Sequence, residues 1–350
     1  MRQELGVHIA LVGCGAIGSS MTWLLAHMPG VTRITLIDPD SYQKSNLRGQ
    51  HIFPCDVGQP KVAVMARRLR TLNPELDVTA MVAPVEDVPL GLLRAHLLLA
   101  GLDSRAARQT VNEIAWRLGI TWIDAGVLES GKLARVNVYV PEAGAACLEC
   151  SWDEGDYAAL EAEYPCGVVT ADSQSDTSPA LGTLAASLSA IELQKILSGD
   201  EAHAAIGRQV TVDARTHRML TTSFRRNPDC RFDHMRWSTT PLRCSLQRLT
   251  VGEALAMTGT MRVAGHGFVR LLVCRQCGFR LEGLRLDRPK ARCLKCGTRM
   301  VAPGFDELLS RLDGSLPVEC LSRSLAQVGL ASGDVVCGTE KQFELLAEVL

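Results

Sequence analysis

The sequence predicts an α/β protein with a doubly wound, Rossmann-like and mostly parallel sheet, followed by a small zinc-binding domain. Three observations support this. The apolar run that begins at His8 breaks at glycines spaced G-x-G-x-x-G, which is typical of a turn from a buried parallel strand into a helix. Segments with strand and helix periodicity then alternate along the chain. Two C-x2-C pairs follow in the last third of the sequence.

The composition limits the class of protein. A length of 350 residues predicts about two domains, and 47% hydrophobic residues can form a substantial core. The formal net charge of −1 argues against a nucleic-acid partner or an anionic membrane. We find no apolar run of about 18 residues and no leader sequence, so we expect a cytoplasmic protein without a membrane span. The 13 cysteines include C-x2-C pairs, which indicate metal thiolates in a reducing compartment.

The glycine loop predicts a nucleotide site. Gly13, Gly15 and Gly18 allow the backbone to turn tightly and approach a phosphate. Free N–H groups at the start of a helix from Ala16 can bind that anion. Asp38 ends the next apolar run, about 20 residues further on, where a carboxylate can bind ribose hydroxyls. This loop alone fits enzymes that use nicotinamide, flavin or ATP.

The next segments continue the alternation of strands and helices. Residues 39–60 are polar and rich in glycine and proline, so we expect a long loop over the glycine cradle. The apolar run from His96 ends at Asp103, and ligands of a parallel sheet collect at such strand ends. We predict helices over 61–72 and 105–118, and strands over 77–82, 96–103, 120–124 and 133–140.

The following region predicts a crossing loop and then a domain boundary. Residues 151–178 are acidic and irregular, so we expect a loop that contains Cys166. Ser178 and Pro179 are typical of the start of a helix, which we place over 179–197. Strands are expected over 209–213 and 219–224. The change in composition that follows predicts domains at 1–238 and 239–350.

Lys61 and Asp103 have positions suited to adenylation chemistry. A carboxylate that attacks the α-phosphate of ATP brings two anions together, so a lysine, an arginine and a metal-bound carboxylate must stabilise the charge. Hydride transfer needs none of these groups. The simpler alternatives are a solvated Lys61 and an Asp103 that only caps the following helix. Arg108, one turn along that helix, can likewise be solvated.

The ordered motifs GCGAIG, LIDPD, SNLRGQ, GQPKV and AGLDS resemble the superfamily of ubiquitin-activating enzymes and ThiF/MoeB-type adenylyltransferases of sulfur-carrier proteins. The resemblance implies an enzyme that joins AMP, from ATP with Mg²⁺, to the C-terminal glycine of a ubiquitin-like or sulfur-carrier protein and releases pyrophosphate. It also implies the roles of the site residues: Asp38 at the ribose, Asn46, Arg48, Gln50 and Lys61 around the phosphates, and Asp103 as the Mg²⁺ ligand.

The chain departs from this family at two places. Arg48 stands one position earlier than the family's phosphate-binding arginine, and Gly49 occupies the usual place. Relatives also lend an N-terminal arginine to the neighbouring subunit of a homodimer, and Arg2 is the candidate here. The resemblance further implies that Cys166 forms a thioester with the activated protein, and that a conjugating enzyme is a further partner.

Two zinc sites are predicted. The spacing C-x2-C-x15-C-x2-C is typical of a structural site with four thiolates and no open position, formed by Cys274, Cys277, Cys293 and Cys296. The pair Cys147 and Cys150 needs two further ligands, unless both are simply buried. In the resembled family these ligands follow an Arg-Asn-Pro segment, which implies Cys230 and His234 here, with Asp233 as the alternative to the histidine. We expect the other cysteines to be packing residues: Cys14, Cys55, Cys244, Cys320 and Cys337.

Three rival functions remain. An enzyme that adenylates a peptide C-terminus would be expected to carry an N-terminal peptide-binding domain, which this sequence does not show. An NAD-dependent oxidoreductase would leave the GQPKV motif and Asp103 without a role. A catalytically silent scaffold would not require Lys61 or Asp103.

Overall fold

The computed structural model describes residues 6–128, 130, 132–162, 178–287 and 291–347. The chain forms two compact units. Unit 1 comprises Met1–Glu86 and Arg94–Arg236, and unit 2 comprises Asp87–Leu93 and Trp237–Leu350. The short segment Asp87–Leu93, which the sequence analysis assigned to the first domain, therefore groups with unit 2.

Unit 1 contains an eight-stranded sheet in the order β3-β2-β1-β4-β5-β6-β7-β8. Strands β1 to β5 run parallel, and β6, β7 and β8 follow in antiparallel pairings. The predicted α/β fold with a mostly parallel sheet is confirmed. The strands are β1 (Val7–Val12), β2 (Val31–Ile37), β3 (Asp77–Met81), β4 (Leu97–Ala100), β5 (Thr121–Leu128), β6 (Leu133–Tyr139), β7 (Arg208–Asp213) and β8 (Arg218–Ser223).

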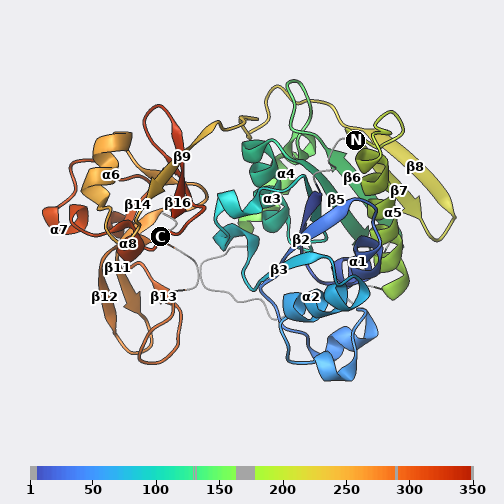
Figure 1. Ribbon diagram of the computed structural model, residues 1–350, viewed down its shortest axis with the longest axis horizontal. Helices are drawn as coiled ribbons and strands as arrows, with labels where there is room; N and C mark the ends of the chain where they lie inside the picture. Colours follow the sequence, from blue (N-terminus) through green and yellow to red (C-terminus); the bar gives the residue numbers. More distant parts are fainter. Residues whose placement is uncertain (1–5, 129, 131, 163–177, 288–290, 348–350) are drawn as a thin grey trace. The chain divides into compact units, whose positions relative to one another are not determined.

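Helices cover both faces of this sheet. Figure 1 shows α3 on one side and α1, α2 and α5 on the other. In α2 the side chains of Val62, Met65 and Leu69 recur at helical spacing and are fully buried, each worth roughly 1.5–3 kcal/mol. The helices are α1 (Ala16–Ala26), α2 (Lys61–Leu72), α3 (Arg105–Leu118), α4 (Glu154–Ala162) and α5 (Pro179–Leu197), with short 3-10 turns η1 (Lys44–Arg48), η2 (Pro54–Asp56), η3 (Val85–Asp87), η4 (Leu90–Leu93) and η5 (Leu148–Ser151).

Two sequence expectations about helices were wrong. The segment after residue 151 was expected to be irregular, but it contains α4. At its start, the backbone N–H of Asp153 donates to the Asp156 carboxylate and the backbone N–H of Asp156 donates to the Asp153 carboxylate. This reciprocal cap stabilises a short helix. We also found no apolar run of about 18 residues, yet α5 qualifies as a candidate membrane span by its length and composition alone. In the fold α5 packs against α1 and the sheet, and its Leu181 and Leu193 are buried in the core of unit 1.

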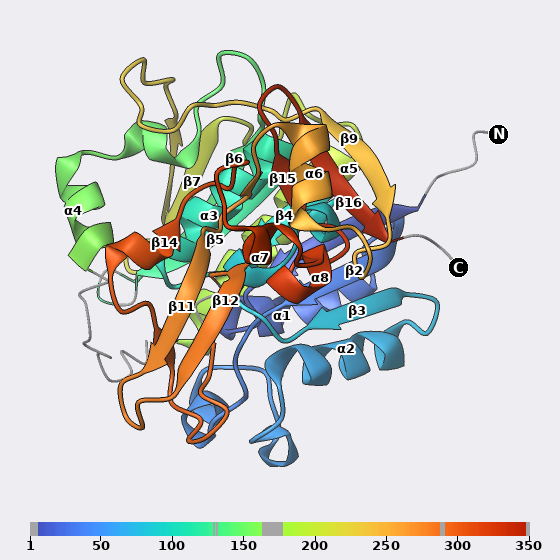
Figure 2. The ribbon, with the colours of Figure 1, turned by 90° about the vertical axis from the view of Figure 1, so that its left-hand side faces the viewer.

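Unit 2 contains two small sheets and two hydrophobic clusters, and the larger cluster includes buried side chains from both sheets. In the first, β16 pairs parallel with β9 and antiparallel with β15. In the second, β11 and β12 form an antiparallel hairpin, which Figure 2 shows side by side. The elements are β9 (Thr239–Cys244), α6 (Val251–Thr258), β10 (Arg262–Val263), β11 (Phe268–Cys274), β12 (Arg280–Leu286), β13 (Met300–Val301), η6 (Phe305–Glu307), β14 (Leu308–Leu309), α7 (Val318–Leu321), α8 (Leu325–Val328), β15 (Val335–Cys337) and β16 (Gln342–Ala347).

Candidate active site

A cavity of about 1170 Å³ lies in unit 1, at the carboxyl ends of β1, β2 and β4. Its volume slightly exceeds the roughly 300–1000 Å³ usual for a small-molecule site, so it has room for a nucleotide and part of a second substrate. The structure brings eight of the sequence-predicted residues to its wall: Gly13, Gly15, Asp38, Asn46, Arg48, Gln50, Lys61 and Asp103.

The three predicted glycines serve different purposes. Gly13 has a φ of +91°, and a Cβ there would lie 2.5 Å from the carbonyl oxygen of Gly101. Gly18 does not line the cavity, and a Cβ there would lie 2.1 Å from the carbonyl oxygen of Gly13. A Cβ at Gly15, by contrast, would meet nothing within 4 Å. Gly13 and Gly18 therefore permit close packing of the loop, whereas Gly15 leaves open space where α1 begins, a suitable place for an anion.

Asp38 is held by the backbone at the end of β2. Its side chain is buried, and its two carboxylate oxygens accept hydrogen bonds from the amides of Cys14, at 2.7 Å, and Asp40, at 2.8 Å. Burial raises the pKa of this carboxyl group, although the Lys61 ammonium opposes the shift. The amide bonds fix the carboxylate between the glycine loop and the long loop, where it can accept hydrogen bonds from a ligand's hydroxyl groups.

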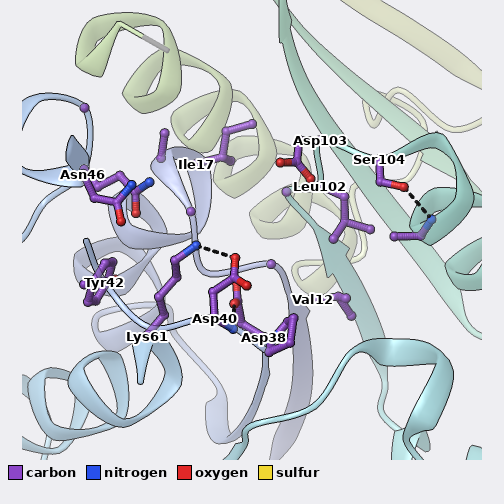
Figure 3. A pocket seen from close by; sticks show the side chains of 18 of the residues that line it. Val12, Ile17, Asp38, Asp40, Tyr42, Asn46, Lys61, Leu102, Asp103 and Ser104 are labelled. Atoms are coloured by element: carbon purple, nitrogen blue, oxygen red, sulfur yellow. Dashed lines mark hydrogen bonds and ion pairs between the residues drawn. The ribbon is translucent and has the colours of Figure 1, made fainter. Parts of the chain in front are cut away.

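Lys61 lies at the first position of α2 and points into the cavity. Its Nζ donates to Asp40 Oδ2 at 2.9 Å, as the dashed line in Figure 3 shows, and its backbone N–H donates to the Asp40 carbonyl at 2.9 Å. Burial lowers the pKa of Lys61, but the nearby carboxylates of Asp38 and Asp40 outweigh it, so the net shift is upward. Lys61 is therefore a fixed cation and not a solvated surface lysine.

Asp103 lies on the other side of the same cavity, after β4 (Figure 3). It does not cap α3, because the N-cap is Ser104, whose hydroxyl accepts from the Ala107 amide at 3.3 Å. Within the described ranges the Asp103 carboxylate has no hydrogen-bond or ion-pair partner. An exposed carboxylate at a strand end is a suitable ligand for a hard divalent cation.

The long loop contributes polar groups that lack partners. Ser45 Oγ and Gln50 Oε1 are buried, line the cavity and have no hydrogen bond to any residue that the structure describes. Buried polar groups are seldom left unpaired, so these two indicate that a ligand completes the site. Asn46 Oδ1 already accepts from the Gln43 amide at 2.8 Å and shapes the turn, whereas Arg48 is an exposed cation of the wall.

A buried charge network beside the cavity was missed by the sequence analysis. Asp124, in β5, is fully buried and accepts from Arg108 Nε at 2.9 Å and Arg135 Nη1 at 2.8 Å. Burial raises the pKa of Asp124, but the two guanidinium groups outweigh burial and lower it overall. Arg108 also donates to the carbonyl of Leu102, next to Asp103, and lines the cavity. Arg108 is thus not a solvated residue; an acid inside the apolar run TWIDAGV was the signal that a buried cation must lie nearby.

A first sulfur cluster lies elsewhere in unit 1. The ligand atoms of Cys147, Cys150, Cys230 and His234 all lie within 4.8 Å of one another. His234 Nδ1 hydrogen-bonds to the Phe232 carbonyl at 2.6 Å, which places the proton on Nδ1 and leaves Nε2 unprotonated, 3.3 Å from Cys150 Sγ. This donor set fits tetrahedral Zn²⁺.

Asp233 does not join this cluster. Both of its carboxylate oxygens bind Arg117, at 2.5 and 3.0 Å. Because Arg117 occupies the carboxylate, His234 and not Asp233 is the fourth candidate ligand. Arg226 Nη1 donates to Cys150 Sγ at 3.7 Å, which offsets part of the negative charge of the thiolates.

A second sulfur cluster lies in unit 2 and is formed by Cys274, Cys277, Cys293 and Cys296, whose sulfur atoms all lie within 4.8 Å of one another. The first cysteine ends β11, and the hairpin folds the second pair back onto the first. Four thiolates leave no position for a substrate, so this arrangement fits a structural metal.

The predicted packing role is confirmed for four of the remaining cysteines and is wrong for one. Cys14, Cys244, Cys320 and Cys337 are buried, as expected for packing residues, but Cys55 is exposed and was interpreted wrongly. Its 3-10 turn directs it away from the core because the neighbouring Asp56 takes the buried position and binds Arg67 and Arg68. Cys166 and Arg2 lie outside the described residues.

Comparisons with known proteins agree with the architecture. The ThiF family matches residues 3–232. The sulfur carrier protein ThiS adenylyltransferase of Escherichia coli (strain K12) is 29% identical over 232 residues, which cover 65% of this chain and 85% of that protein. The molybdopterin-synthase adenylyltransferase of the same organism is 28% identical over 63% of this chain and 85% of its own length. The crystal structure of E. coli MccB with ATP superposes with a TM-score of 0.52 and 23% identity, over 64% of this chain and 66% of that chain, and so shares the fold.

Proposed function

The chain belongs to the ThiF family, and we propose that it is an ATP-dependent adenylyltransferase that activates the C-terminal glycine of a ubiquitin-like or sulfur-carrier protein. One observation carries the proposal: a glycine cradle, three cations and an unpaired carboxylate line a single cavity. The cations are Arg48, Lys61 and Arg108, and the carboxylate is Asp103. This set suits transfer of an adenylyl group and has no use in hydride transfer.

In the proposed reaction, a carboxylate oxygen of the carrier protein attacks the α-phosphorus of ATP. The bond from that phosphorus to the bridging oxygen of pyrophosphate breaks, and an acyl adenylate forms. In the transition state, negative charge is concentrated around the α-phosphorus, which the attacking and the leaving oxygen both contact. Fixed cations at this place therefore stabilise the transition state more than they stabilise the bound substrates. Lys61 and Arg48 face the phosphates, and Asp38 binds the ribose.

Asp103 is the proposed Mg²⁺ ligand, and the metal ion supplies positive charge at the phosphates. Arg108 is anchored by buried Asp124 and holds the Leu102 carbonyl, so it fixes the backbone that carries Asp103. The ion pair between Lys61 and Asp40 is weak, because the Asp40 side chain is 63% exposed. A phosphate can therefore take over the ammonium group at small energetic cost.

We also propose two structural Zn²⁺ sites, one at each sulfur cluster. In unit 1, Zn²⁺ would join the segment at Cys147 to the distant segment at Cys230 and His234. In unit 2, it would stabilise the end of the hairpin that carries the cysteines, where the local hydrophobic cluster is small. Elemental analysis of protein purified without chelator should find two Zn²⁺ ions per chain, and one or none would contradict the assignment.

The family resemblance suggests a homodimer and a thioester step. Trp23 on α1 and Ile191 on α5 are 60% and 48% exposed, and such apolar side chains are suited to a subunit interface. Light scattering of the wild type and of Trp23→Glu tests this.

The proposed acceptor of the activated acyl group is Cys166. A thiol-sensitive adduct on a non-reducing gel that persists in Cys166→Ala would rule out this role of Cys166. A conjugating enzyme would act after that step.

The function is tested by intact-mass spectrometry. The protein is mixed with ATP, Mg²⁺ and small proteins that end in Gly-Gly, and we expect a carrier whose mass increases by one AMP. The same carrier without its last glycine is the matched control, and a peptide with a free C-terminus tests the rival substrate class. Adenylation of the peptide but of no carrier would favour that rival, whereas reduction of NAD without use of ATP would point to an oxidoreductase.

A further inference from the structure

In unit 2, the hairpin of β11 and β12 and the chain segment after it carry the second sulfur cluster and are here called the ribbon. Positive charge is concentrated at the end of the ribbon that holds the cysteines. We define the ribbon tip as residues 274–279 and 291–301. Its exposed cations are Arg275, Arg292, Lys295 and Arg299, and neither segment contains an aspartate or glutamate. Among the residues that the structure describes, none of these four cations forms an ion pair. Since the whole chain has a net charge of −1, this is a local accumulation.

Two of these arginines stand directly opposite each other. Arg292 and Arg299 form an antiparallel bridge, and residues paired in this way project their side chains to one face, with Cβ atoms about 5 Å apart. Like charges in such a pair repel each other and destabilise the structure. Lys295 lies in the loop between them. A bound anion would relieve this repulsion.

Both cysteine knuckles contribute to the same charged end. The side chains of Gln276 and Thr298 hydrogen-bond across from one knuckle to the other, and Cys274 Sγ lies 3.4 Å from Cys296 Sγ. Arg275, beside Gln276, therefore belongs to the same end of the ribbon as Arg299, beside Thr298. The ribbon tip thus presents its cations on a framework fixed by the sulfur cluster.

These four cations do not serve to neutralise the negative charge of the thiolates in the sulfur cluster. In the ribbon tip, the backbone N–H of Lys295 donates to Cys293 Sγ, and Cys296 Sγ donates to the hydroxyl of Thr298. No arginine or lysine side chain of the described tip bonds to a sulfur atom. In unit 1, by contrast, the Arg226 guanidinium does so, at 3.7 Å from Cys150 Sγ. Arg292 Nη1 donates to the Gly297 carbonyl at 3.1 Å and the Lys295 ammonium lies over the Phe279 ring, but all four side chains are exposed and can contact an external partner.

We propose that the ribbon tip docks an acidic and partly apolar face of the protein whose C-terminus is adenylated, an inference that rests on the proposed function. Leu294 is 82% exposed between Arg292 and Lys295, and an apolar side chain among cations suits a protein surface. Nucleic acid fits less well, because single strands bind by base stacking on aromatic rings. The tip's aromatic residue, Phe279, is covered by the Lys295 ammonium, 5.3 Å from the ring centroid.

The test uses charge reversal with a matched control. The tip variant carries Arg292→Glu, Lys295→Glu and Arg299→Glu. The control carries Arg243→Glu, Arg248→Glu and Arg262→Glu, an equal change of charge at exposed positions of unit 2 outside the tip. A milder variant, Arg292→Gln with Arg299→Gln, is used if the tip variant loses Zn²⁺. Binding is measured by fluorescence anisotropy with a labelled peptide of alternating glutamate and leucine, and with a labelled oligothymidylate.

We expect the tip variant to bind the acidic peptide at least about tenfold more weakly than the wild type, and the control to change little. In pyrophosphate exchange, the tip variant should raise the KM for the carrier and leave kcat unchanged. An unchanged KM, or an equal effect in the control, overturns the proposal, as does tight binding of oligothymidylate without binding of the peptide. Absence of exchange in the wild type counts instead against the proposed function.

Discussion

The two units hold their charged groups in opposite ways. Unit 1 buries Asp124 between two arginines and holds Lys61 at the wall of a cavity by its bond to Asp40, so these charges have fixed positions. Unit 2 places its cations at an exposed tip, where solvent screens them. Charges held in place around a cavity can stabilise a transition state, whereas the cations of the tip are suited to attracting a partner.

The two sulfur clusters differ in how much of the surrounding structure supports them. The cluster of unit 1 joins segments more than 80 residues apart and is surrounded by other side chains, with the Trp116 ring 4.7 Å from that of His234. The cluster of unit 2 joins two segments that lie close together in the sequence, and the hydrophobic cluster beside it has only five buried residues. A metal there should therefore order the end of the hairpin that carries the cysteines, whereas the large sheet of unit 1 has a core independent of its cluster.

The largest expected effect is on the buried charges. Asp124→Ala leaves two guanidinium groups without their carboxylate and should destabilise unit 1 by about 3–5 kcal/mol. The matched variant in unit 2 is Glu282→Ala, which removes an exposed partner 3.6 Å from Arg280 and should cost at most ~1 kcal/mol. Urea unfolding monitored for each unit measures both. Equal losses of free energy in the two variants would abolish the contrast between the units.

The next largest effect is on catalysis. Lys61→Ala and Asp103→Ala should each lower carrier-dependent exchange of pyrophosphate into ATP by about two orders of magnitude, because losing one charged partner of the transition state costs ~3 kcal/mol. Both variants should keep their Zn²⁺ and their thermal stability. Exchange at the wild-type rate in both would contradict the assignment of the cavity.

A metal-site comparison sharpens the difference between the clusters. Cys293→Ser should remove one Zn²⁺ and unfold the ribbon tip, while exchange by unit 1 keeps its kcat within about twofold. Cys147→Ser should remove the other Zn²⁺ and leave the ribbon folded. Metal content and proteolysis of the ribbon are the measurements. Loss of nucleotide binding in Cys293→Ser would show that the units are not independent.

The smallest effect concerns pH. The pKa of Asp124 is lowered in the folded protein, so its ion pairs stabilise the fold above the unfolded pKa of about 4 and lose this effect as pH falls through the folded value. The difference in unfolding free energy between the wild type and Asp124→Asn should be constant from neutral pH to about 5 and shrink below 4. A difference that grows on acidification would contradict this sign.

Local signals in the sequence predicted much of the fold. The helices Lys61–Leu72, Arg105–Leu118 and Pro179–Leu197 were predicted with their observed ends. The first two have strong helical periodicity, whereas the third is apolar on most sides and was located by Ser178 and Pro179 at its start. The spacing of Cys274 to Cys296 likewise indicated a cluster that one hairpin could form. Long-range features were harder to predict. No spacing rule pairs Asp124 with Arg108 and Arg135, because the sheet brings them together only in the folded chain.

The central claim is that unit 1 transfers AMP to a carboxylate, and oxygen labelling tests it most directly. A carrier with ¹⁸O in its C-terminal carboxylate is incubated with ATP and Mg²⁺, and hydroxylamine then attacks the acyl carbon of the adenylate. We expect the released AMP to carry one ¹⁸O, because the carboxylate oxygen formed the bond to phosphorus, and Lys61→Ala should release almost none. If the wild-type enzyme instead releases AMP that carries no ¹⁸O, water has attacked ATP, and adenylation of the carrier is contradicted.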